Sequence, residues 1–455
     1  MSGRRAASLL ARAREFREEV RQRMQRRDGP LAGPAASLSD VRKVALILSA
    51  PRSGSSLLQS LLKTLPEVYS LSGECVPFYK LNGLASDADA SDVLPASAGS
   101  RSQRLALGRD FLGDFSMPED ATSDPLWKER YLDDIALRLP LQWPQVPFSY
   151  SAVRKAAGDA LAAHLAAAPR FCKEGFYLEL LARLRQRYPA IDPYYYDIPA
   201  RLVAARFPRL RIPAGPPNDT FLIEEPPFIL LEPRRRAGAA ALRSQTLLLK
   251  STVNCYRLGL IRSLFPNAKV RVLYLTRHPL ASINGLCDGW LHRGFFSRNM
   301  RARLRRGLAI AGYSDQHPWG KWWWNFDLPP GWEEFAASRL ESVCAFQWMS
   351  ANRQVQKVLR ATALPALRIR FEDITGGLAS RKKSLMSICR FLDLDFTDFR
   401  GPLLKTPPVV QATDPPGPRR WMRRKEALLP LLRDRGLQEI SSATGYGEPG
   451  RFILQ

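Results

Sequence analysis

The sequence predicts an α/β fold in which helices flank a central parallel sheet with a P-loop-like turn. Three short apolar runs that suit buried strands support this prediction: residues 44–48, 247–251 and 270–276. After each run and a short connection, the sequence takes up helical spacing, at 57–65, 258–264 and from 279 onward. Strands that alternate with helices in this way form βαβ units, and their strands lie parallel in one sheet.

The loop after the first strand, residues 50–56 (APRSGSS), is expected to bind an anion. It opens a helix, where free backbone N–H groups and the positive end of the helix dipole attract negative charge. Ser53, Ser55 and Ser56 add hydroxyl donors, and the planar guanidinium of Arg52 suits phosphate or sulfate oxygens. Because no Lys follows Gly54, the loop does not match an ATP-binding Walker motif.

Two more cations stand at the ends of the other predicted strands. Lys250 lies at the end of the second strand, and Arg277 directly follows the third. In open α/β sheets, ligands bind beyond the carboxyl ends of the strands. We therefore expect Arg52, Lys250 and Arg277 to converge on one site.

Several motifs, taken in order, give the chain a family resemblance. They are P-R-S-G-S-S in the first loop, L-K-S at 249–251, L-F-P-N-A-K at 264–269, T-R-H-P at 276–279 and L-R-I-R-F-E-D-I at 367–374. Together they resemble sulfotransferases that use 3′-phosphoadenosine 5′-phosphosulfate (PAPS), and the loop has the form found in many bacterial, tyrosylprotein and carbohydrate members. The resemblance covers residues 43–446 apart from the middle of the chain, and implies transfer of a sulfuryl group to a hydroxyl.

The resemblance also implies how the donor is held. Arg277 would bind the 3′-phosphate. The family's partner Ser, eight residues later, is replaced by Gly285, which leaves Ser282 as the nearby hydroxyl. Residues 414–424 resemble the basic loop that closes over PAPS, and its candidate contacts are Arg419, Arg420 and Trp421.

The chemistry of the donor assigns roles to the cations. An acceptor hydroxyl attacks sulfur in line, and negative charge builds on the bridging and leaving oxygens. Positioned cations can stabilise that charge, as they do in phosphoryl transfer. We expect Arg52 and Lys250 to act there and Ser55 and Ser56 to bind the 5′-phosphate. No metal ion is expected, since no His, Cys or carboxylate spacing resembles a metal site.

A general base must take the proton of the acceptor. The resemblance to tyrosylprotein sulfotransferases gives this role to Glu74, although a structural carboxylate paired with an Arg is an equally open interpretation. His278, His317 and Glu225 are further candidates. The stretch 224–228 (EEPPF) is either a loop at the acceptor or, by default, a solvated acidic turn, while Glu372 and Asp373 are expected to brace local structure.

Length and composition suggest how the chain is organised. The 455 residues include 45% hydrophobic residues and carry a formal net charge of +25. We expect a basic amphipathic segment at 1–42 and a sulfotransferase domain at 43–455, with an acceptor-binding insertion at 83–244. Within the insertion, 87–102 is expected to be a mobile loop, and helices are predicted near 152–168 and 176–188. The Trp-rich stretch 319–326 either stacks on an acceptor or, more simply, packs in the core.

The excess positive charge leaves another class of function open, that of a protein that binds nucleic acid or a membrane surface without transfer activity. Its best support is a basic helix near the N-terminus with one apolar face. The same face suits docking onto the core or onto a second subunit. Its apolar residues are Leu9, Ala13, Phe16, Val20 and Met24.

Localisation and acceptor are predicted only in outline. Six dispersed Cys residues suggest free thiols, and the chain shows neither a membrane-spanning run nor a signal-peptide core, so a cytoplasmic, bacterial-type enzyme is expected. The acceptor hydroxyl belongs to a carbohydrate, lipid, peptide or secondary metabolite.

Overall fold

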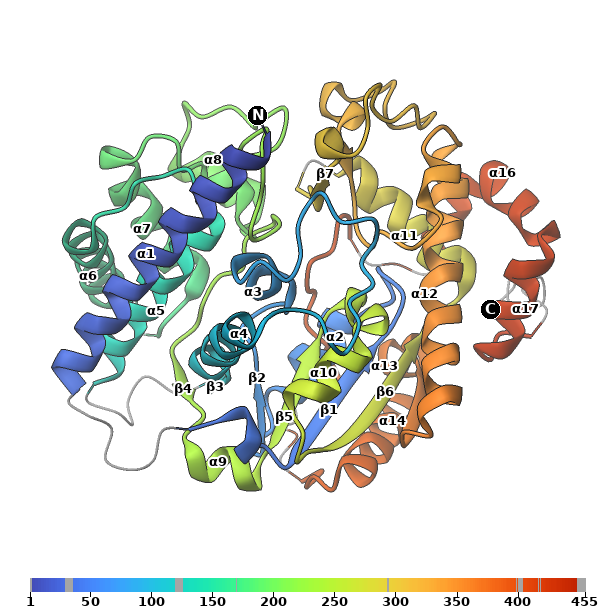
Figure 1. The fold of residues 1–455 in the computed structure, drawn as a ribbon, viewed down its shortest axis with the longest axis horizontal. Coiled ribbons are helices and arrows are strands. Elements are labelled where there is room, and N and C mark those ends of the chain that lie inside the picture. The colour runs from blue at the N-terminus through green and yellow to red at the C-terminus, as the bar shows by residue number, and fades with distance from the viewer. Residues whose placement is uncertain are drawn as a thin grey trace.

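A seven-stranded sheet forms the centre of the molecule (Figure 1). The structure is a computed structural model that describes residues 2–28, 36–118, 126–168, 170–292, 294–397, 399, 404–415, 417 and 419–447. The strand order is β4-β3-β2-β5-β1-β6-β9. The strands are β1 Lys43–Leu48, β2 Val68–Ser70, β3 Ser116–Pro118, β4 Arg234–Arg236, β5 Thr246–Lys250, β6 Lys269–Thr276 and β9 Ala366–Arg370.

The five strands from β2 to β9 run parallel, and β3 and β4 are antiparallel additions at one edge. The strand β1 lies in the middle, where Lys43 is paired with Thr246 of β5 and with Lys269 of β6. The predicted parallel α/β sheet is thus confirmed. Its three central strands all end at the same edge of the sheet.

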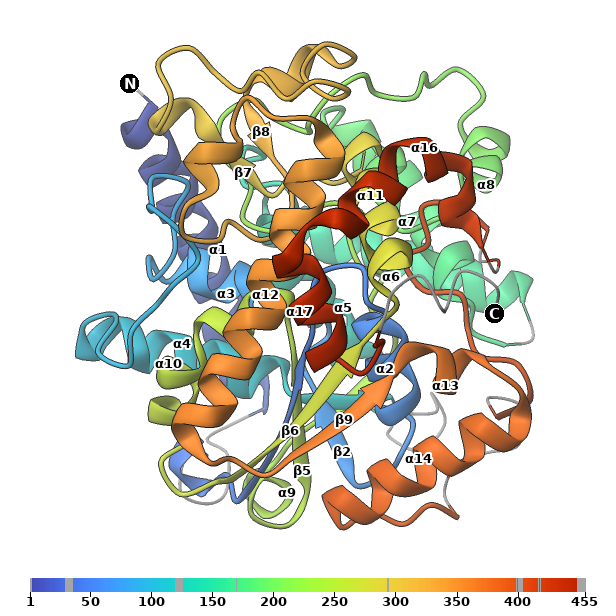
Figure 2. The same cartoon turned by 90° about the vertical axis from the view of Figure 1, so that its right-hand side faces the viewer.

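Helices cover both faces of the sheet, as the alternation of side chains along β1 requires. Val44, Leu46 and Leu48 are buried under one layer of helices, and Ala45 and Ile47 under the other. The first layer comprises α3 Val76–Leu81, α4 Arg101–Asp114, α10 Leu258–Leu264, α11 Pro279–Leu291 and α12 Leu340–Thr362. The second comprises α2 Ser55–Leu62 and α14 Leu378–Leu392, and Figure 2 shows α14 beside β9.

A helical lobe with its own hydrophobic core lies beside the sheet, on the left in Figure 1. It contains most of the helices of the 83–244 insertion, and α6 and α7 confirm the two helices predicted there. Its helices are α1 Ser2–Asp28, α5 Trp127–Gln142, α6 Tyr150–Ala167, α7 Lys173–Arg187 and α8 Ala200–Arg206. Other α-helices and strands of the described residues are α9 Ala239–Ser244, β7 Arg298–Asn299, β8 Trp323–Trp324, α13 Phe371–Thr375, α16 Lys425–Leu428 and α17 Arg435–Ala443.

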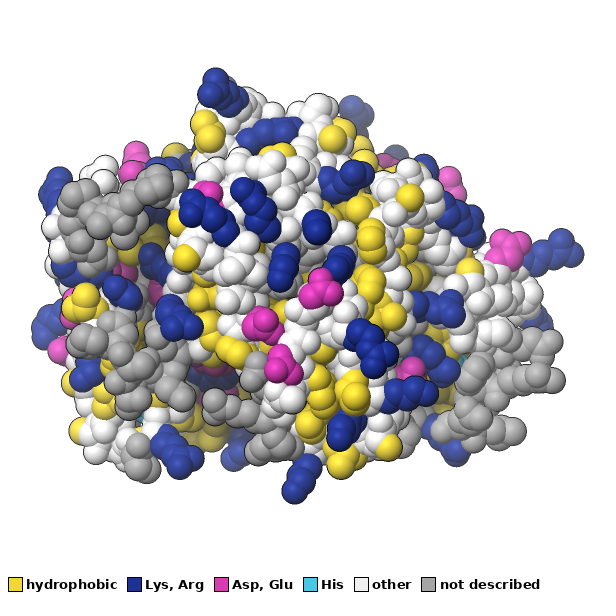
Figure 3. Space-filling model, turned by 90° about the horizontal axis from the view of Figure 1, so that it is seen from below, with side chains coloured by type: hydrophobic (Ala, Val, Ile, Leu, Met, Phe, Trp, Pro, Cys, Tyr) yellow, Lys and Arg dark blue, Asp and Glu magenta, His cyan; other side chains and the backbone are white. Residues whose placement is uncertain are grey.

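The apolar face of α1 docks onto the rest of the chain, which settles the alternatives left open for it. Ala13, Phe16 and Val20 are buried, with Phe16 and Val20 in the core of the lobe. Arg17, on the same helix, is buried as well and donates a hydrogen bond of 2.7 Å to Asp110. A membrane-binding apolar face on this helix was therefore the wrong interpretation. Figure 3 shows Lys and Arg side chains spread over much of the face seen from below.

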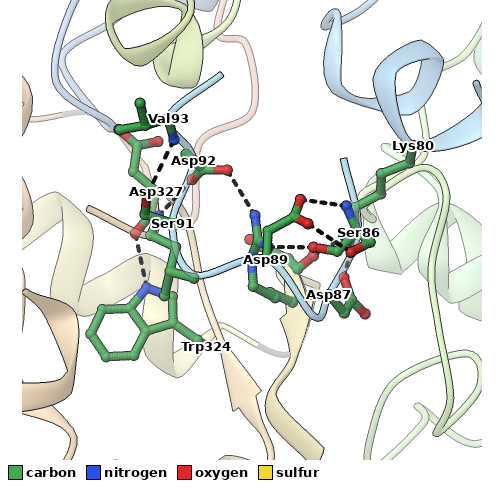
Figure 4. A network of polar contacts seen from close by, with 12 residues as sticks. Lys80, Ser86, Asp87, Asp89, Ser91, Asp92, Val93, Trp324 and Asp327 are labelled. Carbon is green, nitrogen blue, oxygen red and sulfur yellow. Dashed lines mark hydrogen bonds and ion pairs between the residues drawn. The ribbon is translucent and has the colours of Figure 1, made fainter. Parts of the chain in front are cut away.

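The segment 87–102 is tied to the core, so the predicted mobile loop is wrong (Figure 4). Asp92 is 3% exposed and accepts hydrogen bonds from Arg257 at 2.8 Å and Arg298 at 2.7 Å. Asp87 forms an ion pair of 3.3 Å with Lys80. These buried ion pairs join the segment to Arg257 and Arg298, which are distant in the chain, and to the nearby Lys80, and its Ala-, Ser- and Asp-rich composition did not indicate them.

The structure also bears on the Trp-rich stretch, the cysteines and the membrane-spanning character of the helices. In the Trp-rich stretch, Trp323 and Trp324 are buried, and the indole of Trp324 donates to the carbonyl of Asp327 at 2.8 Å, so core packing is the correct interpretation for both. The six cysteines are free thiols. Within the described ranges, no helix combines the length and apolar character needed to cross a membrane.

Candidate active site

The loop after β1 has a backbone that only particular residues can adopt. Gly54 is the N-cap of α2 with φ of 93°, and a Cβ atom there would lie 2.2 Å from the ring of Phe371. Glycine is therefore required at this position both by its backbone angle and by the lack of space. Arg52 also has a positive φ, of 62°. The side chain of Arg52 lines the cavity described below.

The three cations converge as predicted. Arg52, Lys250 and Arg277 all line one cavity of about 1770 Å³ at the carboxyl ends of the parallel strands. The helical lobe forms another part of its wall. Most of the other predicted site residues line the same cavity, namely Gly54, Ser55, Ser56, Glu74, His278, Arg419, Arg420 and Trp421.

Arg52 lies over the ring of Phe295, 5.3 Å from its centroid, and contacts a strap formed by residues 407–413. Its guanidinium donates to the carbonyl of Gln411 at 3.0 Å and to the hydroxyl of Thr413 at 3.4 Å. The Ser56 hydroxyl donates to the side-chain oxygen of Gln411 at 2.7 Å. Burial, assisted by neighbouring cations, lowers the pKa of Arg52 to about 10. The strap thus occupies donors that were predicted to bind the sulfate and phosphate.

Arg277 is held close to the same loop. Its Nη1 donates to the carbonyl oxygen of Arg52 at 2.8 Å, and its guanidinium lies 4.5 Å from the centroid of the Phe371 ring. Burial lowers the pKa of this guanidinium from its usual value. These contacts hold Arg277 in the wall of the cavity.

Ser53 and Ser282 require a correction. Both side chains are buried, their hydroxyls lie 3.3 Å apart, and neither residue lines the cavity. Their contact joins the loop to α11, and their hydroxyls do not face the cavity. Gly285 does line the cavity, but a Cβ atom there would lie 3.3 Å from the Cβ of Arg52.

Glu74 forms an ion pair with Lys250, and the Ser251 hydroxyl donates to its other carboxylate oxygen at 2.8 Å. The sequence left two roles open for this residue, a base or a carboxylate paired with an Arg. The structure shows a paired carboxylate whose partner is a Lys. Both of its oxygens are engaged.

Another carboxylate of the cavity is Glu225, which the sequence offered only as a further candidate for the base. It is half-buried and accepts a hydrogen bond from the Ser297 hydroxyl. Burial raises its pKa to about 7, with a smaller contribution from the negative charge of Glu74. The neighbouring Glu224 is 3% exposed and paired with Arg138 at 2.6 Å, so the solvated acidic turn is wrong. Apolar runs on both sides, FLI and FILL, were the signal that this segment is buried.

The basic C-terminal loop lies against α11. Arg420 forms an ion pair of 2.6 Å with Asp288, and Trp421 stacks on His278 with 6.3 Å between ring centroids. Glu372 braces this region as predicted, since it accepts hydrogen bonds from the backbone N–H of His278 at 2.9 Å and the hydroxyl of Tyr446 at 2.7 Å. His317 stacks on Trp319 and does not line the cavity.

Comparison with known proteins identifies the family of the chain. The family model described as "Sulfotransferase family" matches residues 45–309, which is more than half of the chain. None of the curated proteins matches. Two solved structures are similar: the sulfotransferase domain from the Synechococcus PCC 7002 olefin synthase (16% identity, 91% of this chain and 99% of that chain, TM-score 0.34) and that from the curacin biosynthetic pathway (14%, 89% and 98%, 0.35). Likenesses this distant identify no substrate. On the family match, the chain belongs to the sulfotransferase family.

Proposed function

We propose that this protein transfers the sulfuryl group of PAPS to a hydroxyl of an acceptor. The observation that carries the proposal is the convergence of Arg52, Lys250 and Arg277, from the ends of three parallel strands, on one cavity beside a helix-opening glycine loop. Such a cluster of cations suits anions of matching geometry, and a nucleotide with phosphates on two sides supplies them.

The cavity has room for both a donor and an acceptor. Its volume of about 1770 Å³ exceeds the roughly 300 to 1,000 Å³ typical of a site for one small ligand. Arg277 would hold the 3′-phosphate, and Arg52 with Ser55 and Ser56 the phosphosulfate end. Arg419, Arg420 and Trp421 would close over the nucleotide. The acceptor would enter from the helical lobe, where Tyr194 and Lys173 line the wall.

The reaction is a single in-line displacement. The acceptor oxygen forms a bond to sulfur, and the bond from sulfur to the bridging oxygen breaks, with its electron pair passing to the 5′-phosphate of the product, 3′-phosphoadenosine 5′-phosphate (PAP). Arg52 and Lys250 stabilise the charge that builds on these oxygens, so that transfer needs no metal ion. Glu74 positions Lys250 through their ion pair, and the acceptor proton passes to a carboxylate of the cavity wall.

The acceptor is a hydroxyl of a carbohydrate, lipid, peptide or secondary metabolite. The mixture of aromatic, apolar and charged side chains on the lobe side, such as Tyr194, Ile198 and Lys173, fits a molecule with both polar and apolar parts. The free thiols support activity in a reducing compartment, such as the cytoplasm.

Calorimetric titration with PAP, ATP and AMP tests this function without knowledge of the acceptor. We expect PAP to bind most tightly and to bind equally well in EDTA. Arg52→Ala should weaken PAP binding by about 1.5 to 3 kcal/mol, the range for a charge-assisted hydrogen bond, and abolish transfer. Magnesium-dependent binding of ATP with no response to PAP would refute the proposal.

A further inference from the structure

Two of the carboxylates that line the cavity, Glu74 and Glu225, differ in how many of their oxygens accept hydrogen bonds. Both oxygens of Glu74 are engaged, one by the ammonium of Lys250 and the other by the hydroxyl of Ser251. These two contacts hold the carboxylate of Glu74 against Lys250 and Ser251. Among the residues that the structure describes, only Ser297 donates a hydrogen bond to Glu225, at one of its oxygens.

The segment that precedes Glu225 is held in place by buried contacts. The preceding Glu224 is anchored in the lobe by Arg138, with an N–O distance of 2.6 Å. Lys80, which Figure 4 shows in the buried network, donates to the carbonyls of Leu222 and Ser297, each at 2.9 Å. One buried ammonium therefore joins the segment that bears Glu225 to the segment that bears its hydrogen-bond donor.

The same segments contact the predicted reaction centre. Arg52 lies over Phe295, whose ring is 5.2 Å from that of Phe326. The backbone N–H of Phe326 donates to the Ser297 hydroxyl at 2.7 Å, and that hydroxyl donates to Glu225. A short series of contacts thus runs from the cation at the sulfuryl group to this carboxylate.

We propose that Glu225 accepts the proton of the acceptor hydroxyl and that Glu74 serves to position Lys250. This inference rests on the proposed function. In the step, the acceptor O–H bond breaks as its proton passes to a carboxylate oxygen of Glu225. The acceptor oxygen bonds to sulfur, and the sulfur–oxygen bond to PAP breaks, leaving its electron pair on the phosphate.

The electrostatic surroundings support this role. Burial raises the pKa of Glu225 to about 7, which is where a general base works well at neutral pH. The charged groups that face it are Glu74 after β2, Lys80 of α3, Lys250 of β5 and Arg52 of the loop. Of these, Glu74 raises the pKa of Glu225, and Lys80 and Lys250 lower it.

The direct test compares Glu225→Gln with Glu179→Gln, the same substitution in an exposed ion pair with Arg206 outside the cavity. Conversion of radiolabelled PAPS to PAP is followed with water, simple phenols and sugars as acceptors. We expect Glu225→Gln to lower the rate by roughly 10² to 10⁴, the usual range for a lost general base, and to leave PAP affinity unchanged. Turnover of Glu225→Gln equal to that of the control would overturn the inference.

A titration that requires no acceptor gives a second readout. Isotope-edited infrared spectroscopy of the PAP complex should show a carboxyl that titrates near pH 7 in the wild type and in Glu179→Gln. That signal should be absent in Glu225→Gln. In Glu74→Gln it should move to lower pH, because the loss of a negative charge lowers the pKa of Glu225. Persistence of the signal in Glu225→Gln, or its loss in Glu74→Gln alone, would assign the proton to another group and overturn the inference.

Failure of this inference is distinct from failure of the proposed function. If the wild type does not bind PAP, the sulfotransferase assignment itself fails. If all variants bind PAP equally while Glu225→Gln keeps full turnover, only the role of Glu225 is wrong.

Discussion

The strap at residues 407–413 provides a sharp test of the site, because its contacts compete with the proposed donor. The Ser56 hydroxyl donates to the side chain of Gln411 at 2.7 Å, and Arg52 donates to the Gln411 carbonyl at 3.0 Å. PAP cannot use these donors until the strap releases them. Gln411→Ala removes the side-chain contact and leaves the carbonyl in place.

The size of the effect follows from the contact that is lost. A neutral hydrogen bond contributes about 0.5 to 1.5 kcal/mol, and breaking it is part of the cost of binding in the wild type. Without it, PAP should bind about 2- to 12-fold more tightly, as measured by calorimetry. Gln438→Ala is the matched control, since its amide donates to the carbonyl of Leu432 at 2.7 Å on the exposed surface of α17. Weaker PAP binding in Gln411→Ala would mean that Gln411 contacts the nucleotide rather than displacing it.

Three further substitutions test other parts of the structure. Arg277→Ala should weaken PAP by about 10- to 150-fold but leave adenosine 5′-phosphosulfate, which has no 3′-phosphate, nearly unaffected in the same titration; an equal loss for both ligands would place Arg277 elsewhere. Gly285→Ser should weaken PAP binding, because the added Cβ would lie 3.3 Å from that of Arg52, which has a positive φ. Tighter binding of PAP by Gly285→Ser would show that the loop bearing Arg52 moves to make room for the added side chain. Asp92→Asn should lower the free energy of unfolding in urea by about 3 kcal/mol, because two buried guanidinium groups lose their counter-charge. Asp159→Asn, in the exposed pair with Lys155, should change it by less than about 0.5 kcal/mol, and an equal effect of the two would contradict the buried network.

The sequence was informative wherever the decisive residues are neighbours along the chain. A strand, a loop and a helix within 43–65 predict the anion site, because the order of elements alone places the loop at a helix N-terminus. The convergence of Lys250 and Arg277 on that loop followed from one topological rule for parallel sheets. Both predictions needed no knowledge of side-chain partners.

What the sequence could not indicate depends on residues far apart in the chain. The contact between Arg52 and Gln411 joins residues separated by 359 positions, and that between Lys250 and Glu74 by 176. The burial of Asp92 depends on Arg257 and Arg298, and the sequence around these two arginines does not indicate that they pair with Asp92. Ser53 was assigned to the ligand because the loop motif contains it, but only the placement of α11 turns its hydroxyl toward Ser282.

The pH dependence of transfer follows from the cations and carboxylates taken together. The pKa of Arg52 is lowered to about 10, so this guanidinium remains charged at neutral pH and loses its proton only in strongly alkaline solution. The pKa of Glu225 is raised to about 7, so the carboxylate that accepts the proton forms as the pH rises through that value. We therefore expect a bell-shaped profile of kcat/KM with an acidic limb near pH 7 and an alkaline limb near pH 10. Glu225→Gln should remove the acidic limb and keep the alkaline limb, moved to lower pH because the negative charge of Glu225 raises the pKa of Arg52. An acidic limb that survives in Glu225→Gln would contradict this assignment, because no charge change of Arg52 occurs in that range.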